Sequence, residues 1–584
     1  MQRALSQKPV DDVRWWLRRD GWVLVGYIIA VLIATYPMIL HLADKNWLAA
    51  VGALGRRDLY PKLWDVWYLT TQLGNGNSYF HTSLLYYPTG ADLTFHNFNL
   101  LHILLVDLFN IVTRNIAASF NFAALLTLLL NAYTAYLLIL TLTGNQESGF
   151  YGGLIFGIMP WNLIHMSVHP EVMTLFLFPL LILSFIKAIT LLNWKYAAMA
   201  GILGGLSAYV GLYILAAAGI TLFLILVGMT IQDKRWSRRK FWMVLALMTI
   251  IAGAIMIPRI TPLLADSSQL GTALSEKYKA GAYYDILSYV IPLKLASRYT
   301  SLLGQHVSWT SWLYVGIIPL GFAFVGLISP TVRRKSAGWL LIAIFFMVLT
   351  LGTYLSAGNW VLTDFEMPRT FLDRVLPLPF RMFRDPRFYF IGVLLPTAIA
   401  TAEGMKYVLG LLPKQQYLRI AFVGILAVVT LVDYWIGPFR QANLNYSMFF
   451  EQIQKSDEEF AILYLPMDRN STKFYNYLQT IHHHPRVDGF VAREVPANFQ
   501  SIKGNLLLSM WYSAEKLDCT QADGDQMESA VKDLVTENVR YIIISVKGLV
   551  PFSAYFEGID PAYQDNLIVV YKVDDLMQHP PCSR

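Results

Sequence analysis

Long runs of apolar residues recur along the chain as far as residue 437. Each run is close to the ~20 residues that a helix needs to cross the hydrocarbon core of a membrane. The candidate segments are 22–42, 97–113, 116–142, 149–166, 171–191, 196–210, 212–231, 241–259, 312–329, 338–357, 387–407 and 418–437. This pattern predicts a polytopic α-helical membrane protein.

The short basic loops orient these segments. Positive charge gathers in 232–240, in 331–336 and around Lys406, Lys414 and Arg419, and such loops lie on the cytoplasmic side, as does the basic N-terminus. These basic loops all lie on the cytoplasmic side only if one of the early apolar segments does not cross the membrane. Segment 97–113 is short and polar in places, so we expect it to be interfacial or re-entrant. About eleven transmembrane helices then remain, in a multi-pass protein of the plasma (inner) membrane.

With about eleven crossings that start from a cytoplasmic N-terminus, the chain divides into three regions. Residues 1–21 form a cytoplasmic N-terminus, 22–439 a transmembrane domain with its first outer loop at 43–115, and 440–584 an exocytoplasmic domain. In the last region, β-rich runs at 461–467, 540–546 and 566–573 alternate with a helical stretch at 526–538. We therefore expect a small α/β domain there. Its two cysteines, Cys519 and Cys582, either pair in an oxidising compartment or stay free.

Composition agrees with the membrane prediction and narrows the function classes. The 584 residues are 55% hydrophobic and 15% charged, with a mean hydropathy of +0.44, which is too apolar for a soluble protein. The net charge of +7 is typical of the positive-inside bias, so no nucleic-acid partner is indicated. A Walker loop, a dinucleotide glycine fingerprint and a serine-hydrolase elbow are all absent from the sequence, which leaves nucleotide-driven pumping unsupported.

Two carboxylates lie among aromatic residues in the first outer loop, in the stretch RRDLYPKLWDVWYL (56–69). Pro61 suits the first position of a helix, which would place Asp58 in irregular backbone and Asp65 on a more polar face of an interfacial helix. Such a carboxylate can take a proton from an attacking hydroxyl or hold a cation. The alternative is that Asp58 favours the helix start and Asp65 faces water. Tyr60 and Trp64 are candidates to hold lipid or sugar faces.

A second outer segment, NLIHMSVHPEVM (162–173), brings His165, His169 and Glu171 close together. We interpret them as residues that orient a substrate. Zinc binding and polar capping of two helix ends are the alternatives, and Pro170 interrupts the helical spacing that zinc-binding helices use.

A further outer segment, RVLPLPFRMFRDPRFYF (374–390), carries Arg374, Arg381, Arg384 and Arg387 against the positive-inside bias. Guanidinium groups spaced three residues apart can bind the phosphate of a lipid carrier through bidentate hydrogen bonds. Ordinary lipid headgroups, or an internal ion pair with Asp373 or Asp385, are the alternatives.

Together these blocks resemble the GT-C superfamily of integral membrane glycosyltransferases, in its poorly characterised bacterial branch. The resemblance is carried by RRDLYPKLWDVWYL, TSLLYYPTGADLTFHNFNLL (82–101), WLYVGIIPLGFAFVGL (312–327), PLPFRMFRDPRFYF and LYLPMDRNSTKFYNYLQTIHHHPRVDGFVAREVP (463–496). It implies transfer of a sugar from a polyprenyl-phosphate carrier to an outer-face glycan, lipid or protein acceptor. It also implies that Asp58 is the first-loop acid, as base or metal contact, with a divalent cation optional. The usual adjacent acidic pair is absent, so Asp65 is the candidate second carboxylate.

The mechanism expected from this resemblance is inverting transfer, with Asp58 deprotonating the acceptor and Arg381, Arg384 or Arg387 stabilising the departing phosphate. The alternative is a non-catalytic GT-C-shaped membrane scaffold that binds a partner through its outer domain. Its surface would include TIHHHPRVDGF (480–490), whose three consecutive histidines form a loop, a partner surface or a pH-responsive patch. Transport of a lipid-linked glycan would need a polar path through the helices, which the sequence lacks.

Overall fold

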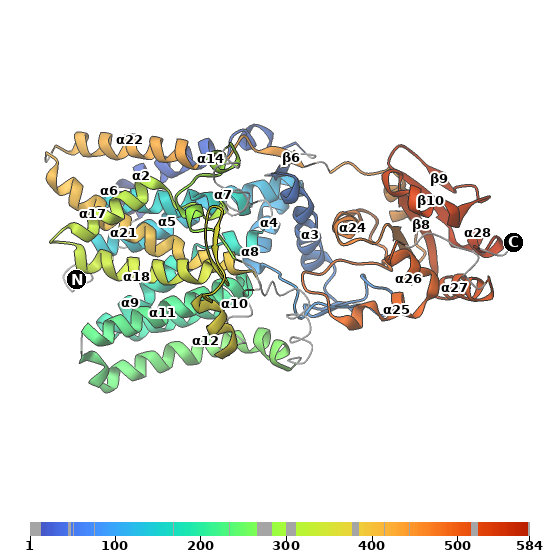
Figure 1. The fold of residues 1–584 in the computed structure, drawn as a ribbon, viewed down its shortest axis with the longest axis horizontal. Helices are drawn as coiled ribbons and strands as arrows, with labels where there is room; N and C mark the ends of the chain where they lie inside the picture. Colours follow the sequence, from blue (N-terminus) through green and yellow to red (C-terminus); the bar gives the residue numbers. More distant parts are fainter. Residues whose placement is uncertain are drawn as a thin grey trace. The chain divides into compact units, whose positions relative to one another are not determined.

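The computed structural model describes residues 13–44, 48–50, 52–74, 76–166, 169–232, 234–265, 283–298, 311–375, 383, 385–413, 415–442, 444–514 and 524–581. Over these residues the chain forms two compact units (Figure 1). The helical unit comprises 13–50, 98–265 and 283–441, and the α/β unit comprises 52–97 and 442–581. Arg381, Arg384, Cys519 and Cys582 lie outside the described residues.

The helical unit contains most of the predicted apolar segments as α-helices. They are α2 (Val13–Ala34), α4 (Leu100–Thr113), α5 (Ile116–Thr143), α6 (Gln146–Ile158), α7 (Pro160–His165), α8 (Pro170–Met173), α9 (Leu177–Leu191), α10 (Trp194–Val210), α11 (Leu212–Gln232), α12 (Arg239–Ala265), α14 (Leu293–Arg298), α17 (Ile317–Ile328), α18 (Arg333–Thr350), α19 (Pro368–Val375), α21 (Ile391–Leu411) and α22 (Gln416–Tyr434). Short pairings join β1 (Leu48–Ala50) to β6 (Arg440–Ala442), and β4 (Leu355–Ala357) to β5 (Trp360–Leu362).

Side chains that bind the first free amides mark where several of these helices begin. Asn99 caps α4 by accepting from the amide of His102, and Asn115 caps α5 by accepting from Ala118. Helix α5 ends at Gly144 with φ +66, a left-handed conformation that glycine adopts without a Cβ penalty. The next residue, Asn145, already caps α6. Antiparallel neighbours therefore follow each other with almost no loop.

Six of the described helices are long and apolar enough to cross a membrane: Ile116–Thr143, Pro170–Leu191, Leu212–Ile231, Arg239–Ala265, Pro386–Leu411 and Gln416–Tyr434. Shorter apolar helices, among them Leu100–Thr113, accompany them. The polytopic membrane character predicted from the sequence is confirmed. The predicted number of about eleven spans stays a prediction.

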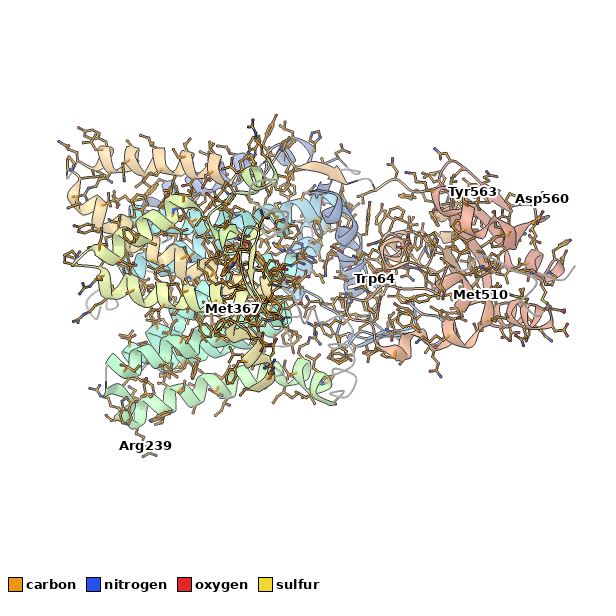
Figure 2. The ribbon with its side chains drawn as sticks, in the orientation of Figure 1. Trp64, Arg239, Met367, Met510, Asp560 and Tyr563 are labelled. Carbon is orange, nitrogen blue, oxygen red and sulfur yellow. The ribbon has the colours of Figure 1, made fainter. Side chains whose placement is uncertain are left out.

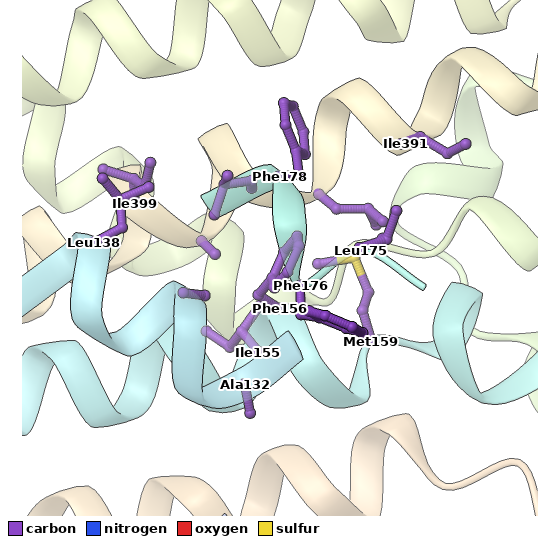
Figure 3. Packing of buried hydrophobic residues seen from close by; sticks show 14 of the residues in the cluster. Ala132, Leu138, Ile155, Phe156, Met159, Leu175, Phe176, Phe178, Ile391 and Ile399 are labelled. Atoms are coloured by element: carbon purple, nitrogen blue, oxygen red, sulfur yellow. The ribbon is translucent and has the colours of Figure 1, made fainter. Parts of the chain in front are cut away.

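The core of the helical unit lies where α5, α6, α9 and α21 pack against one another. Figure 3 shows Phe156, Met159, Leu175 and Ile391 among its side chains, all of them fully buried. Helix α21 is buried along most of its length, from Ile391 to Met405, whereas α12 and α22 are mostly exposed. The central helix thereby fixes the positions of the residues at both of its ends.

The α/β unit holds a four-stranded sheet in the order β7-β8-β10-β9, with β7 parallel to β8 and β10 antiparallel to both its neighbours. Its strands are β7 (Ala461–Leu465), β8 (Val539–Ser545), β9 (Tyr563–Gln564) and β10 (Ile568–Lys572). Its helices are α3 (Gly52–Thr71), α23 (Phe449–Gln454), α24 (Arg469–His482), α25 (Gln500–Gly504), α26 (Leu506–Tyr512), α27 (Gly524–Thr536) and α28 (Val573–Gln578). The predicted β-rich runs and the predicted helix at 526–538 are confirmed.

The first-loop residues 52–97 are built into this same unit. Helix α3 packs on α24, and the hairpin of β2 (His81–Thr82) with β3 (Ala91–Asp92) follows it. The backbone of Tyr86 and Tyr87 donates to the carbonyls of Asp488 and Arg486 at 3.2 and 2.9 Å. A segment that is distant in sequence from the C-terminal region therefore completes its fold.

Candidate functional site

The helical structure is interrupted between α6 and α9, and two buried asparagines satisfy backbone groups that this bend in the chain frees. Asn131 donates to the carbonyl of Met173 at 2.8 Å and accepts from the amide of Leu175 at 3.0 Å. Asn99 donates to the carbonyl of Pro170 and to the hydroxyl of Thr174, both at 2.9 Å. Non-helical backbone inside a membrane protein needs such internal partners. The bend is therefore held in one conformation.

This bend positions the three polar residues predicted from the second outer segment. His169 Nδ1 lies 3.1 Å from Oε1 of Glu171, and the rings of His165 and His169 are 5.8 Å apart. The side chain of Glu171 is buried and that of His169 is 25% exposed. The three predicted residues therefore do gather in one place.

Aromatic side chains surround His165. Its Nδ1 is 2.7 Å from the carbonyl oxygen of Trp161, so Nδ1 carries the proton and donates. Burial lowers the pKa of His165 well below its usual value, and His169 and Arg387 lower it further. The imidazole is therefore neutral at physiological pH. Its buried Nε2 has no protein partner among the described residues and can accept a hydrogen bond.

Arg387 is distant in sequence from these three residues but lies close to His165. Asp385 caps the 3-10 helix η5 (Pro386–Phe390), with Oδ1 accepting from the amide of Arg387 at 3.1 Å and Oδ2 lying 3.3 Å from its Nε. The guanidinium carbon lies 5.2 Å from the ring centre of Trp312, and the ring of Trp312 is 5.8 Å from that of His165. The alternative of an ion pair with Asp385 is thus confirmed for Arg387.

A tyrosine that the sequence did not single out fixes Asp385. The hydroxyl of Tyr284 donates to Asp385 Oδ1 at 2.5 Å. Burial, followed by the negative charge of Asp385, raises the pKa of Tyr284, so the phenol stays protonated and remains a donor. We name His165, His169, Glu171, Asp385, Arg387 and Tyr284 the His–Arg cluster. It offers a guanidinium, a carboxylate–imidazole pair and a neutral imidazole acceptor side by side.

The described residues hold no group of three or more His, Cys, Asp or Glu side chains arranged to bind a metal ion. His165, His169 and Glu171 therefore do not form the zinc site considered from the sequence.

The first-loop residues have surroundings that differ from those predicted. Helix α3 runs unbroken through Pro61, so Asp58 lies within the helix and the expectation of irregular backbone is wrong. The packing of α3 on α24, which buries Leu59 and Leu63, offsets the amide hydrogen bond that Pro61 cannot make. Asp58 forms an ion pair with Lys473 of α24, and its side chain is 28% exposed.

Asp65 is buried, so the expectation of a polar or water-facing side is wrong. Its two carboxylate oxygens are engaged by Lys62 at 3.1 Å and His96 at 2.8 Å. The reason is that this face of α3 lies against other parts of the α/β unit and not against solvent. Asp65 therefore holds Lys62 and His96 inside the α/β unit, and its role as a second catalytic acid stays a prediction.

The aromatic candidates of α3 pack inside the α/β unit. Trp64 is fully buried and stacks on Tyr68 with ring centres 4.7 Å apart, and its Nε1 donates to Gln479 at 2.8 Å. Tyr60 lies edge-on to Phe474 at 4.9 Å. Trp64, labelled in Figure 2, presents no open face to a lipid or sugar, which corrects the prediction for this residue.

Among solved structures, two membrane glycosyltransferases have similar folds. ArnT from Cupriavidus metallidurans, bound to undecaprenyl phosphate, matches with a TM-score of 0.51 and 13% identity over 95% of this chain and 98% of its own. Arabinofuranosyltransferase AftD from Mycobacteria matches with a TM-score of 0.51 and 12% identity over 90% of this chain, which spans only 35% of AftD.

Both matched proteins belong to the GT-C superfamily, so the predicted GT-C fold is confirmed. No family model matches the sequence, and no curated protein matches it significantly. At this level of identity the likeness establishes the fold.

Proposed function

We propose that this chain, which has the GT-C fold, transfers a sugar from a polyprenyl-phosphate carrier to an acceptor hydroxyl on the outer side of the plasma membrane. The observation that carries the proposal is the position of Arg387 beside His165, His169 and Glu171 within one unit. The presence of undecaprenyl phosphate in the ArnT structure of similar fold supports a carrier of this class.

Arg387 would bind the phosphate of the carrier. Its Nε edge is paired with Asp385 and its plane is held against Trp312 and Phe388, with centroid distances of 5.2 and 5.1 Å. The ion pair with Asp385 engages the Nε edge, and the Nη edge would bind the phosphate. A pre-oriented guanidinium stabilises charge that develops on a leaving phosphate.

The pair of Glu171 and His169 would activate the acceptor. A carboxylate that accepts from one imidazole nitrogen makes the ring a better proton acceptor and fixes its orientation. The pair takes the proton of the acceptor hydroxyl, whose oxygen attacks the anomeric carbon. The bond from that carbon to the phosphate oxygen breaks with inversion, and its electron pair leaves with the phosphate. Neutral His165 would accept a hydrogen bond from a sugar hydroxyl through Nε2.

Asp58 is the alternative base, which the first-loop resemblance predicts. Because Lys473 pairs with its carboxylate, that role requires the ion pair to loosen when substrate binds. Replacing each acid separately distinguishes the two candidates. If Glu171→Gln abolishes transfer and Asp58→Asn retains it, the Glu171 and His169 pair is the base. The reverse result assigns the role to Asp58.

The decisive experiment measures transfer from a panel of radiolabelled polyprenyl-phosphate sugars by the purified protein in nanodiscs. We expect Arg387→Gln to lower kcat/KM by about 10²–10³-fold, as loss of one charge-stabilising donor does. The control is Arg239→Gln, because Arg239 is exposed at the start of α12 and projects away from the other helices (Figure 2).

Equal turnover by Arg387→Gln and wild type would remove Arg387 from the mechanism. Absence of turnover with every donor, in protein that remains folded, would instead favour a non-catalytic scaffold that binds a partner through its outer domain. The burial of His482 and His484 excludes these two side chains from such a partner surface, because only His483 of the three histidines is exposed.

A further inference from the structure

The helical unit contains a cavity of about 620 Å³ that the proposed sugar transfer does not use. It lies among the C-terminal ends of α9 and α11, the first half of α18 and the second half of α21, where its walls include Ile186, Ile189, Ile225, Ile342 and Phe345. Its volume is in the range of ~300–1,000 Å³ that is typical of small-molecule sites. Most of its lining is aliphatic or aromatic, which suits an acyl chain.

One wall of this cavity carries a buried carboxylate. The side chain of Glu403 is 1% exposed, and neither of its oxygens has a hydrogen-bond partner in the described structure. Lys335 Nζ lies 4.0 Å from Oε1, which is an ion pair but longer than a hydrogen bond. Lys406, less than one turn further along α21, donates to the carbonyl of Thr143. Burying a carboxylate with unfilled acceptor positions is costly, so a donor from a ligand would stabilise it.

The same cavity carries two cations beside the carboxylate. Arg334 and Lys335, at the start of α18, both belong to the lining and are both exposed. Exposed cations next to an apolar wall are suited to the phosphate of a membrane lipid, because the headgroup stays hydrated while the chain enters the cavity.

We infer that this cavity binds an aminophospholipid of the phosphatidylethanolamine type. Its phosphate would pair with Arg334 and Lys335, its ammonium group would donate to Glu403, and an acyl chain would lie along the wall formed by Ile189, Ile225 and Ile342. The ethanolamine headgroup carries an anion and an N–H donor two carbons apart, which matches the cations and the carboxylate of one wall. Phosphatidylcholine lacks the N–H donor, and phosphatidylglycerol lacks the positive charge.

This lipid site is separate from the His–Arg cluster. Glu403 lies about 18 Å along α21 from Ile391, at about 1.5 Å per residue, whereas Arg387 precedes that helix. The loop that leads into α18 is among those predicted to face the cytoplasm. Lipid binding here therefore does not depend on sugar transfer, and failure of either proposal leaves the other standing.

The test is native mass spectrometry of the delipidated protein in detergent, titrated with phosphatidylethanolamine, phosphatidylcholine or phosphatidylglycerol of identical acyl chains. Wild type should retain phosphatidylethanolamine in preference to the other two. Glu403→Gln should lower its retention by at least about tenfold and abolish the preference, because a buried charge pair is lost. Lys335→Gln should weaken binding of all three lipids by removing a phosphate contact.

Two further variants keep the result interpretable. Glu366→Gln is the matched control, since Glu366 is a 47% exposed glutamate paired with Arg374 elsewhere in the helical unit, and its lipid binding should equal that of wild type. Ile342→Trp should fill the cavity and reduce all lipid adducts. Equal retention of the three lipids by wild type, a preference for phosphatidylglycerol, or unchanged binding by folded Glu403→Gln would overturn the inference.

Discussion

The Nε2 atom of His96 lies 2.8 Å from Oδ1 of Asp65, with both side chains buried in the α/β unit. The amide of Ala492 donates to Nδ1 of the same ring at 3.1 Å, so Nε2 carries the proton and donates to the carboxylate. The other carboxylate oxygen of Asp65 accepts a hydrogen bond from Lys62 Nζ at 3.1 Å. Asp65 thereby joins α3 to the segment that follows the β2–β3 hairpin.

Asp65→Asn should destabilise the protein without altering its chemistry. The amide has one acceptor oxygen where the carboxylate has two, so the Lys62 or His96 donor loses its partner. We expect a loss of about 1–3 kcal/mol in the free energy of unfolding. Thermal unfolding followed by circular dichroism measures it. The exposed Asp560, labelled in Figure 2, supplies the control Asp560→Asn, which should stay within about 0.5 kcal/mol of wild type. Equal stability of the two variants would contradict this role.

Arg486 and Asp488 form a second buried pair in the α/β unit. Arg486 donates to the two carboxylate oxygens at 2.6 and 3.1 Å and to Asn476 Oδ1 at 2.9 Å. Arg486→Met leaves a buried carboxylate uncompensated and should cost about 3–5 kcal/mol. The double variant Arg486→Met/Asp488→Leu should cost clearly less than the sum of the single ones. A double-mutant cycle by chemical unfolding measures this coupling, and additive effects would show that the pair contributes little.

The paired histidines of TIHHHPRVDGF should make stability depend on pH. Burial lowers the pKa of His482 and of His484. Above pH ~6.5 these rings are neutral in both the folded and the unfolded state. Below that pH the unfolded chain binds protons at these rings, whereas the folded chain does not. Stability should therefore fall as the pH drops from 7 toward 5, by up to about 1.4 kcal/mol per pH unit for each ring. Melting temperatures across this range measure the slope.

His482→Gln should make that slope shallower, while the exposed His579→Gln leaves it unchanged. A slope in His482→Gln identical to that of wild type would assign the pH dependence to other groups. The histidines would then serve only in packing.

The contrast between Asp58 and the strands of the α/β unit shows what the sequence can predict. Alternating and apolar patterns located β7, β8 and β10, because local periodicity reports burial directly. The partner of Asp58, Lys473, lies 415 residues away, and no local pattern links them. Pro61 predicts a helix start, but packing on α24 keeps α3 helical on both sides of it, and no local pattern indicates that packing. The meeting of Arg387 with His165 likewise depends on how the helices pack.

Tyr284→Phe tests whether Asp385 positions Arg387. Removing the hydroxyl deletes the 2.5 Å hydrogen bond to Asp385, so the carboxylate and the guanidinium it pairs with lose their fixed orientation. A hydrogen bond to a charged group contributes about 1.5–3 kcal/mol. We expect KM for the polyprenyl-phosphate donor to rise by about tenfold with a smaller change in kcat. Tyr283→Phe, at the neighbouring position, is the control, and an unchanged KM in Tyr284→Phe would contradict the positioning role.

Two glycines of α21 provide a matched test of helix packing in the helical unit. A Cβ built on Gly404 would lie 1.8 Å from the carbonyl oxygen of Phe322 in α17, whereas one built on Gly410 meets nothing within 4 Å. Small residues let membrane helices approach closely, so Gly404→Ala must push α17 away from α21. We expect a loss of about 1–3 kcal/mol, as overpacking causes, and a neutral or slightly stabilising effect for Gly410→Ala because alanine favours helix. Thermal unfolding in nanodiscs compares the two variants directly. Similar melting temperatures would show that α17 and α21 do not pack as closely as described.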